Sequence, residues 1–369
     1  MRILHITSTF FPDSNGGIEQ VIRQICINSD HFSVENRVFT LSNNPNPEVF
    51  IKDGIKIFRA KKNVEIASSG FSINAFKQFK KQLEWADIIH YHFPWPFADL
   101  LHLFCQVKKK SIITYHSDIV RQKKLNFFYS PLMTYFLNNV DKIVTTSRNY
   151  LETSTVLRKY KDKVVVIPIG VSESSLPEID DADLTNMRSK VGQDFFLFIG
   201  SLRRYKGLSV LLDAINGTKL KCVIAGSGAE EVNLIKQSKK LNLSNVQFLM
   251  RVNDKDKVAL LKLCRAVVFS SILRSEAFGV SLVEGSMFAK PLISTNLGTG
   301  TSFVNLDGDT GIEVPPSNCN ALREAMIQLN DNDELSNKMG IAARLRYEEL
   351  FTGQLMVQKY VELYKSLNN

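Results

Sequence analysis

The stretch Phe195-Phe-Leu-Phe-Ile-Gly-Ser-Leu-Arg-Arg-Tyr-Lys-Gly207 decides the fold. Its first five residues are apolar and end at Gly200, which is typical of a short buried strand. Apolar residues at helical spacing follow from Leu208 to Ile215, so a strand, a loop and a helix are predicted in succession. The loop carries three cations at the carboxyl end of the strand, where open α/β sheets bind phosphates through Arg and Lys. The alternative is a basic loop that is simply solvated.

Short apolar runs alternate with amphipathic helical patterns along the rest of the chain. Such alternation predicts parallel, doubly wound sheets with helices on both faces, which is an α/β architecture. The runs that we expect to form strands are residues 2–7, 36–42, 55–59, 87–91, 111–115, 142–146, 164–167, 195–199, 220–225, 246–249, 266–270 and 291–294.

Length and composition fit two domains. The chain has 369 residues, of which 44% are hydrophobic. Two cores of roughly 170 to 180 residues each would account for it. We expect the boundary to follow Ile167-Pro-Ile-Gly-Val171, because the polar and acidic segment Ser172–Asp183 has the character of a linker. A last helix is expected at about residues 354 to 367, where apolar residues recur at helical spacing.

A second stretch, Arg274-Ser-Glu-Ala-Phe-Gly-Val-Ser-Leu-Val-Glu284, places two carboxylates in an apolar segment. Gly279 predicts a loop that enters a helix at about Val280, which leaves the amides of residues 278 to 280 free to bind an anion. Carboxylates beside such a site could hold the ribose and sugar hydroxyls of a nucleotide sugar, whose diphosphate would lie between them. The alternative is a surface Glu276 and a Glu284 that only the helix dipole favours.

Together these stretches resemble the retaining glycosyltransferases of family 4. The resemblance spans nearly the whole chain and rests on Phe11–Gln20, Thr114–Arg121, Gly200–Gly207, Glu276 with Glu284, and Gly298–Asn305. It implies the GT-B fold, in which two Rossmann-like domains face each other across a cleft and the C-terminal helix returns to the first domain. Residues 1–171 with 352–369 would bind the acceptor, and residues 172–351 the nucleotide-sugar donor.

The resemblance also implies roles for individual residues. The expected donor-binding residues are Gly16, Gly17, Arg203, Lys206, Phe278, Gly279, Val280 and Glu284. His116 and Glu276 are the expected catalytic residues, and Asp118 and Arg121 the expected acceptor-binding residues. From the residues alone, Gly16-Gly17 could be a plain turn and His116 a structural histidine at the end of a strand.

The motifs are most similar to those of the bacterial branch that builds O-antigen and related surface polysaccharides. This implies transfer of mannose or a related hexose from a GDP-sugar to a glycan or lipid-linked acceptor, with retained configuration and without metal or another cofactor. Ser201 stands where many members carry Arg, and Met250 where many carry Gly, so the base preference stays open. A UDP-sugar donor and a sugar-nucleotide epimerase of the same fold are the alternatives. A dinucleotide oxidoreductase would need a glycine fingerprint, which Gly226-Ser-Gly228 does not complete.

Charge is unevenly distributed along the chain. The formal net charge is +9, and all of it lies in residues 1–170, which hold 23 Lys and Arg against 14 Asp and Glu. A basic helix with Phe76, Phe79 and Leu83 at helical spacing could attract an anionic membrane surface. The alternative is that these apolar residues are core and the lysines a solvated face. No nucleic-acid module is recognisable, so we expect no nucleic-acid partner.

The remaining patterns argue against a metal site and an exported protein. His90 and His92 would share one face of a strand, but no third ligand lies near them in sequence. Asp181-Ala-Asp183 precedes a helical pattern and is expected to cap it rather than to hold a metal. Five scattered cysteines favour reduced thiols, and Met1–Thr7 is too short an apolar run for a signal peptide. We therefore expect a cytoplasmic protein, which the basic first half could hold at the inner face of the cell membrane.

Overall fold

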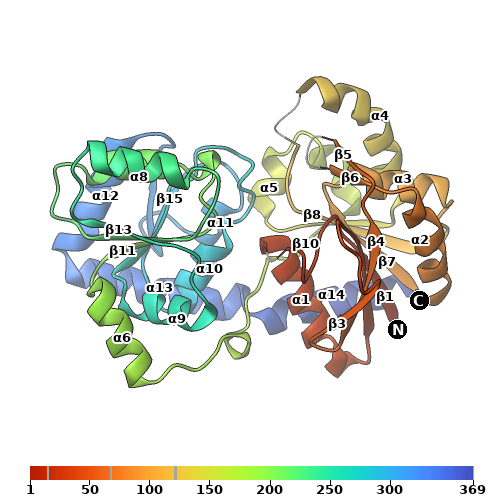
Figure 1. Cartoon of the computed structure of the whole chain (residues 1–369), viewed down its shortest axis with the longest axis horizontal. Helices are drawn as coiled ribbons and strands as arrows, with labels where there is room; N and C mark the ends of the chain where they lie inside the picture. Colours follow the sequence, from red (N-terminus) through yellow and green to blue (C-terminus); the bar gives the residue numbers. More distant parts are fainter. Residues whose placement is uncertain (15, 67–68, 120–122, 369) are drawn as a thin grey trace. The chain divides into compact units, whose positions relative to one another are not determined.

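The structure, a computed structural model, describes residues 1–14, 16–66, 69–119 and 123–368. The chain forms two compact units (Figure 1). Unit 1 consists of Met1–Gly170 together with the segment from Gly353 onward, and unit 2 of Val171–Thr352. Each unit contains a sheet with helices on both faces, so the expectation of two doubly wound α/β sheets is confirmed.

The sheet of unit 1 has eight strands in the order β10-β9-β8-β7-β1-β2-β4-β3. Only β3 is antiparallel to its neighbour. Sequence analysis missed β3, although Asp53 and Gly54, both at positive φ, form the Asp-Gly turn that typically joins a hairpin. The strands are β1 (Arg2–Ile6), β2 (Glu35–Ser42), β3 (Val49–Lys52), β4 (Ile55–Lys61), β7 (Ile88–Phe93), β8 (Lys110–Tyr115), β9 (Lys142–Thr145) and β10 (Val164–Val166).

Helices cover both faces of this sheet, and a small hairpin of β5 (Val64–Ile66) and β6 (Ser69–Phe71) stands apart from it. The helices are α1 (Gly17–Asn28), α2 (Asn74–Trp85), α3 (Pro96–Phe104), α4 (Lys123–Asn139), α5 (Arg148–Thr153) and α14 (Gly353–Asn368). On α2, Phe79 is fully buried while Lys77, Lys80 and Lys81 are exposed. The apolar face of α2 therefore belongs to the core of unit 1, and its lysines face solvent. For this helix, the alternative to a membrane-binding surface is the correct one.

The C-terminal helix α14 belongs to unit 1, where it packs beside α1 (Figure 1). Its buried tyrosines reach the sheet: the Tyr364 hydroxyl lies 2.7 Å from His90 Nδ1, and the Tyr360 hydroxyl 2.9 Å from Thr114 Oγ1. The predicted return of the last helix to the first domain is confirmed.

The sheet of unit 2 has six parallel strands in the order β13-β12-β11-β14-β15-β16. The chain runs outward from β11 in one direction and then returns to build from β14 in the other. The order therefore reverses between β11 and β14, and open α/β sheets bind ligands at the carboxyl ends of the strands at such a point. The strands are β11 (Phe196–Ile199), β12 (Cys222–Ala225), β13 (Val246–Leu249), β14 (Ala266–Phe269), β15 (Leu292–Thr295) and β16 (Gly311–Val314).

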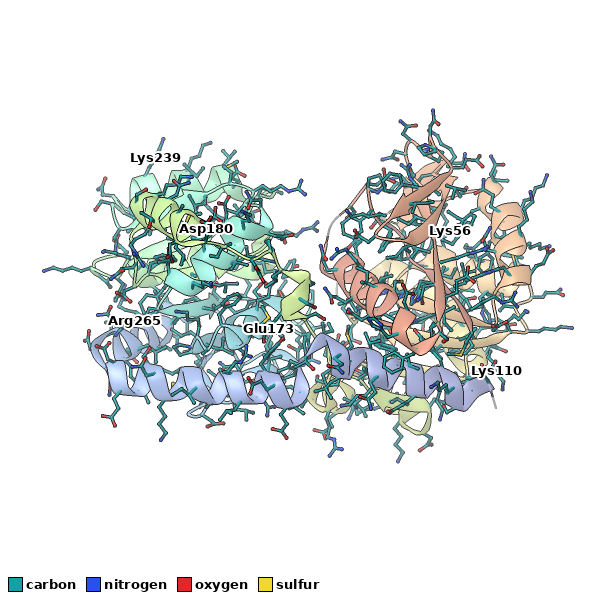
Figure 2. The ribbon with its side chains drawn as sticks, turned by 90° about the horizontal axis from the view of Figure 1, so that it is seen from below. Lys56, Lys110, Glu173, Asp180, Lys239 and Arg265 are labelled. Atoms are coloured by element: carbon teal, nitrogen blue, oxygen red, sulfur yellow. The ribbon has the colours of Figure 1, made fainter. Side chains whose placement is uncertain are left out.

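The helices of unit 2 bury an apolar stripe against the sheet, as α7 does with Leu208, Leu211, Leu212 and Ile215. Asp180, which is labelled in Figure 2, caps α6 by accepting from Asp183 N at 2.8 Å. Asp183 Oδ2 in turn accepts from the Asp180 amide at 3.4 Å. Capping was the expected role of this acidic cluster. The helices are α6 (Asp181–Val191), α7 (Leu208–Ile215), α8 (Glu231–Lys240), α9 (Asp254–Leu263), α10 (Val280–Met287), α11 (Thr301–Val304), α12 (Cys319–Asp331) and α13 (Asp333–Leu350).

Within the described residues, no helix combines the length and the apolar character that crossing a membrane requires.

Candidate functional site

Two loops meet at the point where the strand order of unit 2 reverses. The loop after β11 carries Lys206, and the loop after β14 lies against it through a hydrogen bond from Ile272 N to Tyr205 O at 2.7 Å. The contact requires glycine at position 207, where φ is +68° and a Cβ would lie 2.0 Å from the carbonyl oxygen of Ser270. Ser270 Oγ also donates to Lys206 O at 3.0 Å. The two loops are therefore joined by one hydrogen bond between their backbones and by one from the Ser270 side chain.

Lys206 and Glu276 form an ion pair where these loops meet, from Nζ to Oε2. Both side chains are nearly buried, at 11% and 12% exposure. Ser271 Oγ donates to the same carboxylate oxygen at 3.2 Å, and the Lys206 ammonium lies 4.6 Å from the centroid of the Phe269 ring. The structure thus brings together two residues that the sequence placed 70 positions apart, one expected at the phosphates and one at the sugar.

Helix α10 begins at Val280, as expected, and its amino end is preceded by Gly279 at φ +95°. The first amide to donate within the helix is that of Leu282, to Gly279 O at 3.0 Å. The amides of Phe278, Gly279 and Val280 precede it and therefore have no partner inside the helix. The loop before them is fixed by Gly300 N, which donates to Ala277 O at 2.8 Å. A helix start held in this way can bind an anion.

Glu284 lies on the second turn of α10 and is paired with a cation that sequence analysis did not find. Lys257 Nζ on α9 lies 2.8 Å from Glu284 Oε1 and 3.6 Å from Asp254 Oδ1. Burial alone would lower the pKa of the Lys257 ammonium, but the two carboxylates outweigh it and hold that pKa above its ordinary value. No sequence signal links positions 257 and 284. The remaining predicted donor residue of unit 2, Arg203, is exposed at the start of the basic loop.

In unit 1, the predicted glycines Gly16 and Gly17 lie at the start of α1, next to a buried carboxylate that the sequence analysis overlooked. Glu19 Oε2 accepts from Gly16 N at 3.1 Å, and Glu19 Oε1 accepts from Thr9 Oγ1 at 2.8 Å. Glu19 thereby ties the loop after β1 to the helix start. Its position in Gly-Gly-Ile-Glu, two residues after the second glycine, was the available signal.

His116 and Asp118 follow β8, as the strand prediction implies. His116 is 8% exposed, and burial lowers the pKa of its imidazole to about 3, so the ring is neutral at pH 7. Asp118 Oδ1 accepts from Ser154 Oγ at 2.7 Å and from the Tyr115 hydroxyl at 3.0 Å, which holds this loop against the rest of the unit. Arg121 lies outside the described residues. Acceptor contacts by Asp118 and Arg121 stay predictions.

The pair His90 and His92 does share a face, with ring centroids 4.4 Å apart, and the fold adds a third histidine from β1. The nitrogens of His5, His90 and His92 lie within 4.8 Å of one another. Each nitrogen already has a hydrogen-bond partner, since His90 contacts Tyr364 and Thr114 while His5 and His92 contact each other and further side chains. A metal ion would have to displace these bonds.

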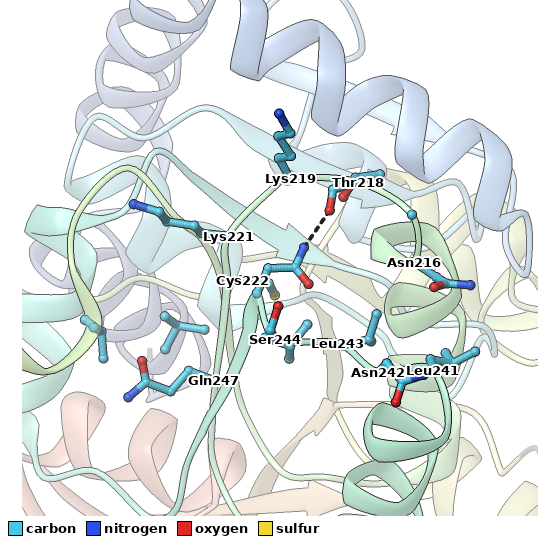
Figure 3. A pocket seen from close by; sticks show the side chains of 15 residues that line it. Asn216, Thr218, Lys219, Lys221, Cys222, Leu241, Asn242, Leu243, Ser244 and Gln247 are labelled. Carbon is cyan, nitrogen blue, oxygen red and sulfur yellow. Dashed lines mark hydrogen bonds between the residues drawn. The ribbon is translucent and has the colours of Figure 1, made fainter.

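A hollow of about 700 Å³ also lies in unit 2, around Lys219, Lys221 and Gln247 (Figure 3). Apart from Val191, its lining residues are 216–219, 221–223 and 241–247, which precede or begin β12 and β13 and so lie at the amino ends of these strands. Lys206 and Glu276 follow the carboxyl ends of β11 and β14, at the opposite edge of the sheet. The loops after β11 and β14, and not this hollow, are therefore the candidate functional site.

Comparison with known proteins identifies the family. Residues 15–175 match the model of Glycosyltransferase Family 4, and residues 182–346 that of Glycosyl transferases group 1. The chain is 48% identical over 352 residues to the D-rhamnosyltransferase WbpZ of Pseudomonas aeruginosa, covering 95% of this chain and 92% of that protein. It is 46% identical to the O-antigen chain mannosyltransferase C of Escherichia coli, covering 100% and 99%. The chain is a family 4 glycosyltransferase.

Solved structures place this glycosyltransferase in the GT-B fold. Sucrose-phosphate synthase from Thermosynechococcus elongatus superposes with a TM-score of 0.81 at 19% identity, over 99% of this chain and 98% of that one. The Anabaena protein HepE, in complex with UDP and glucose, superposes with a TM-score of 0.80 at 16% identity, over 99% of both chains. The recognition and the fold class that the sequence motifs implied are therefore confirmed.

Proposed function

We propose that this glycosyltransferase transfers mannose or a closely related hexose from a GDP-sugar to a glycan or lipid-linked acceptor in O-antigen synthesis, with retention and without a metal. The observation that carries the proposal is the identity of 46% to 48% over almost the full length to a mannosyltransferase and a D-rhamnosyltransferase. The GDP donor rests on the resemblance of the motifs to that branch.

The donor diphosphate is assigned to the loops after β11 and β14. Lys206 and the exposed Arg203 supply positive charge, and the amides at the start of α10 supply hydrogen-bond donors. Together they would neutralise the charge that grows on the leaving diphosphate, which is the task that a divalent metal performs in other transferases. Metal independence follows from this assignment, and transfer that persists in excess chelator would support it.

The two carboxylates are assigned to hydroxyl groups of the donor. Glu284, on the second turn of α10, would hold the ribose, with the ion pair to Lys257 keeping its carboxylate in place. Glu276 would orient the transferred sugar, and donor phosphate would take over the Lys206 ammonium that Glu276 now contacts. His116 keeps the catalytic role that the resemblance implies for it, beside the transferred sugar. The acceptor hydroxyl would attack from the face of the leaving group, which retains the anomeric configuration.

The test is thermal stability of the full chain with GDP, UDP, TDP, ADP or NAD, each at about a hundredfold its dissociation constant. A ligand that binds only the folded state then adds about 2.7 kcal/mol, which is a readable shift. A shift with GDP alone is expected. A shift with UDP alone would keep the fold and overturn the donor, and sugar interconversion without an acceptor would then identify an epimerase. A shift with NAD alone would overturn the transferase assignment.

We also propose that unit 1 docks on an anionic membrane surface, where a lipid-linked acceptor would lie. The support is an exposed apolar pair, Phe127 and Phe128 on α4, at 76% and 80% exposure, in the unit that carries the excess positive charge. Lys108 to Lys110 add exposed cations before and at the start of β8. Apolar side chains that insert while cations meet anionic headgroups are the usual combination for such binding.

A further inference from the structure

Four buried polar side chains form one continuous hydrogen-bonded row across the sheet of unit 1. Asn36 Oδ1 lies 3.2 Å from His5 Nε2, His5 Nδ1 lies 3.1 Å from His92 Nε2, and His92 Nδ1 lies 3.0 Å from His116 Nε2. We call these residues the imidazole row. At most 9% of any of the four residues is exposed, so water does not compete for these bonds.

Strand register explains why the row is straight. Asn36 on β2 lies opposite Ile3 on β1, and His5 follows Ile3 by two residues. His5 in turn lies opposite His90 on β7, and His92 follows His90 by two residues. Thr114 is in turn opposite His92, two residues before His116. Each step to the next strand is therefore matched by two residues along it. Side chains two apart share a face of a sheet, so the row runs diagonally over one face and ends where β8 ends.

The amide of Asn36 sets the direction of the row at its inner end. Its Nδ2 group lies 3.3 Å from both Cys26 O and Val34 O, which can only accept hydrogen bonds. Nδ2 also lies 2.7 Å from Ser29 Oγ, which itself donates to Cys26 O at 3.2 Å. These three acceptors fix the orientation of the Asn36 amide, with Nδ2 pointing toward them. The Oδ1 atom, an acceptor, therefore faces His5, and His5 Nε2 must carry a proton to donate to it.

The same reasoning passes from ring to ring, because each neutral imidazole has one donor and one acceptor nitrogen. Burial lowers the pKa of His5 to about 4 and that of His92 well below its ordinary value, so both rings are neutral at pH 7. With its proton on Nε2, His5 accepts at Nδ1 from His92 Nε2–H. His92 then accepts at Nδ1 from His116 Nε2–H. His116 is left with a proton on Nε2 and a lone pair on Nδ1.

We propose that Asn36, His5 and His92 are positioning residues, which fix His116 in the Nε2–H tautomer and present its Nδ1 as an acceptor for a hydroxyl group of the transferred sugar. The inference rests on the proposed function, which puts His116 beside that sugar. A neutral acceptor suits this place in two ways. It binds a hydroxyl without adding positive charge near a carbon that becomes positive during transfer, and it cannot protonate the leaving group.

The tautomer can be read without any substrate. The full chain labelled with ¹⁵N-histidine has six histidines, which single substitutions would assign in long-range ¹⁵N–¹H correlation spectra. At pH 7.5 we expect a pyrrole-type Nε2 and a pyridine-type Nδ1 for His116. A pyridine-type Nε2, or a rapid mixture of the two tautomers, would overturn the proposal.

Kinetics test the effect on transfer, with His90 as the matched control. His90 stands on the same strand and is equally buried, but it bonds Tyr364 and Thr114 and is outside the row. His92→Leu and His90→Leu both remove buried hydrogen bonds, so both should lower the melting temperature. Only His92→Leu frees His116 to change tautomer, and we expect it to lower kcat on the order of tenfold more than His90→Leu.

A conservative variant separates positioning from packing. In His92→Asn the side-chain oxygen stands near the place of Nδ1 and can accept from His116 Nε2–H, so kcat should recover most of the loss while stability does not. Equal kcat for His92→Leu and His90→Leu would overturn the proposal. Failure of the proposed function would look different: the wild-type protein would transfer no sugar, while the tautomer of His116 would still be measured as described.

Discussion

Lys206 and Glu276 neutralise each other in a nearly dry setting, so neither can be replaced alone without consequence. Lys206→Met should leave a buried carboxylate that, among the described residues, keeps the hydrogen bond from Ser271, at a cost of about 3 kcal/mol in the free energy of unfolding. Lys206→Met with Glu276→Gln should regain much of that stability because no unpaired charge remains. Both variants should lose transfer by about a hundredfold or more, since the diphosphate loses its cation.

Urea unfolding and transfer rates of the two single variants and the double variant measure these effects as a double-mutant cycle. A double variant that is no more stable than Lys206→Met would show that the pair is not coupled. Wild-type transfer by a folded Lys206→Met protein would remove Lys206 from the donor site.

The buried histidines make stability depend on pH. Burial lowers the pKa of His5 and His102 to about 4 and that of His116 to about 3, and it holds His90 and His92 well below the ordinary value. Below pH 6.5 the unfolded chain therefore binds protons that the folded chain does not. The free energy of unfolding is unaffected by these groups above that pH and falls as the pH drops toward 4.

Between pH 7.5 and 5.5 each such histidine should cost about 1.4 kcal/mol, from the difference in proton uptake between the two states. Urea unfolding at intervals of half a pH unit measures the slope of the free energy of unfolding against pH. A His5→Gln variant starts from lower stability but should show a slope smaller by about one proton. An unchanged slope in that variant would mean that His5 is protonated in the folded protein.

At the scale of elements, the site depends on how closely two loops approach. Gly207→Ala would bring a Cβ within 2.0 Å of Ser270 O at a φ of +68° and force the loops apart. Gly217→Ala is the matched control, because its φ of +77° imposes similar backbone strain while nothing lies within 4 Å of the added atom. We expect about 1 kcal/mol of destabilisation from strain at Gly217. A further loss of about 2 kcal/mol is expected at Gly207, because the added atom overpacks the loop contact.

Nucleotide binding distinguishes the two glycine variants further. Gly207→Ala should also reduce the stabilisation by GDP, because the displaced loops carry Lys206 and Glu276. Gly217→Ala should retain it, since this glycine lies at the amino ends of the strands, at the edge opposite to these loops. Differential scanning fluorimetry with and without GDP gives both quantities. Equal nucleotide shifts in the two variants would mean that the loop contact does not shape the donor site.

The elements were predictable where one local pattern decides them. All twelve expected strands are present, because a run such as Phe196–Ile199 must be buried on both faces of a parallel sheet. Gly311–Val314 was missed because it is short and contains Glu313. Contacts between distant positions were not predictable: nothing near Glu284 indicates Lys257, and nothing near His92 indicates His5. The order of the strands in each sheet brings these two pairs of residues together. The sequence pattern predicts the strands but not their order.

For the whole molecule, the excess charge of the first half gives the membrane proposal a quantitative test. Binding of the full chain to anionic vesicles should exceed binding to neutral vesicles and weaken from about 0.1 M to 1 M salt, as the screening length falls from about 10 Å to 3 Å. Phe127→Ser with Phe128→Ser should reduce binding at both salt concentrations, because the inserted apolar surface is lost. The control is Ile341→Ser with Leu345→Ser on α13, each 60% exposed in the unit without excess charge. Vesicle sedimentation measures the binding of each protein to anionic and to neutral vesicles at both salt concentrations. Equal binding to anionic and neutral vesicles would remove the electrostatic part of the proposal, and equal effects of the two double variants would remove α4 as the inserted element.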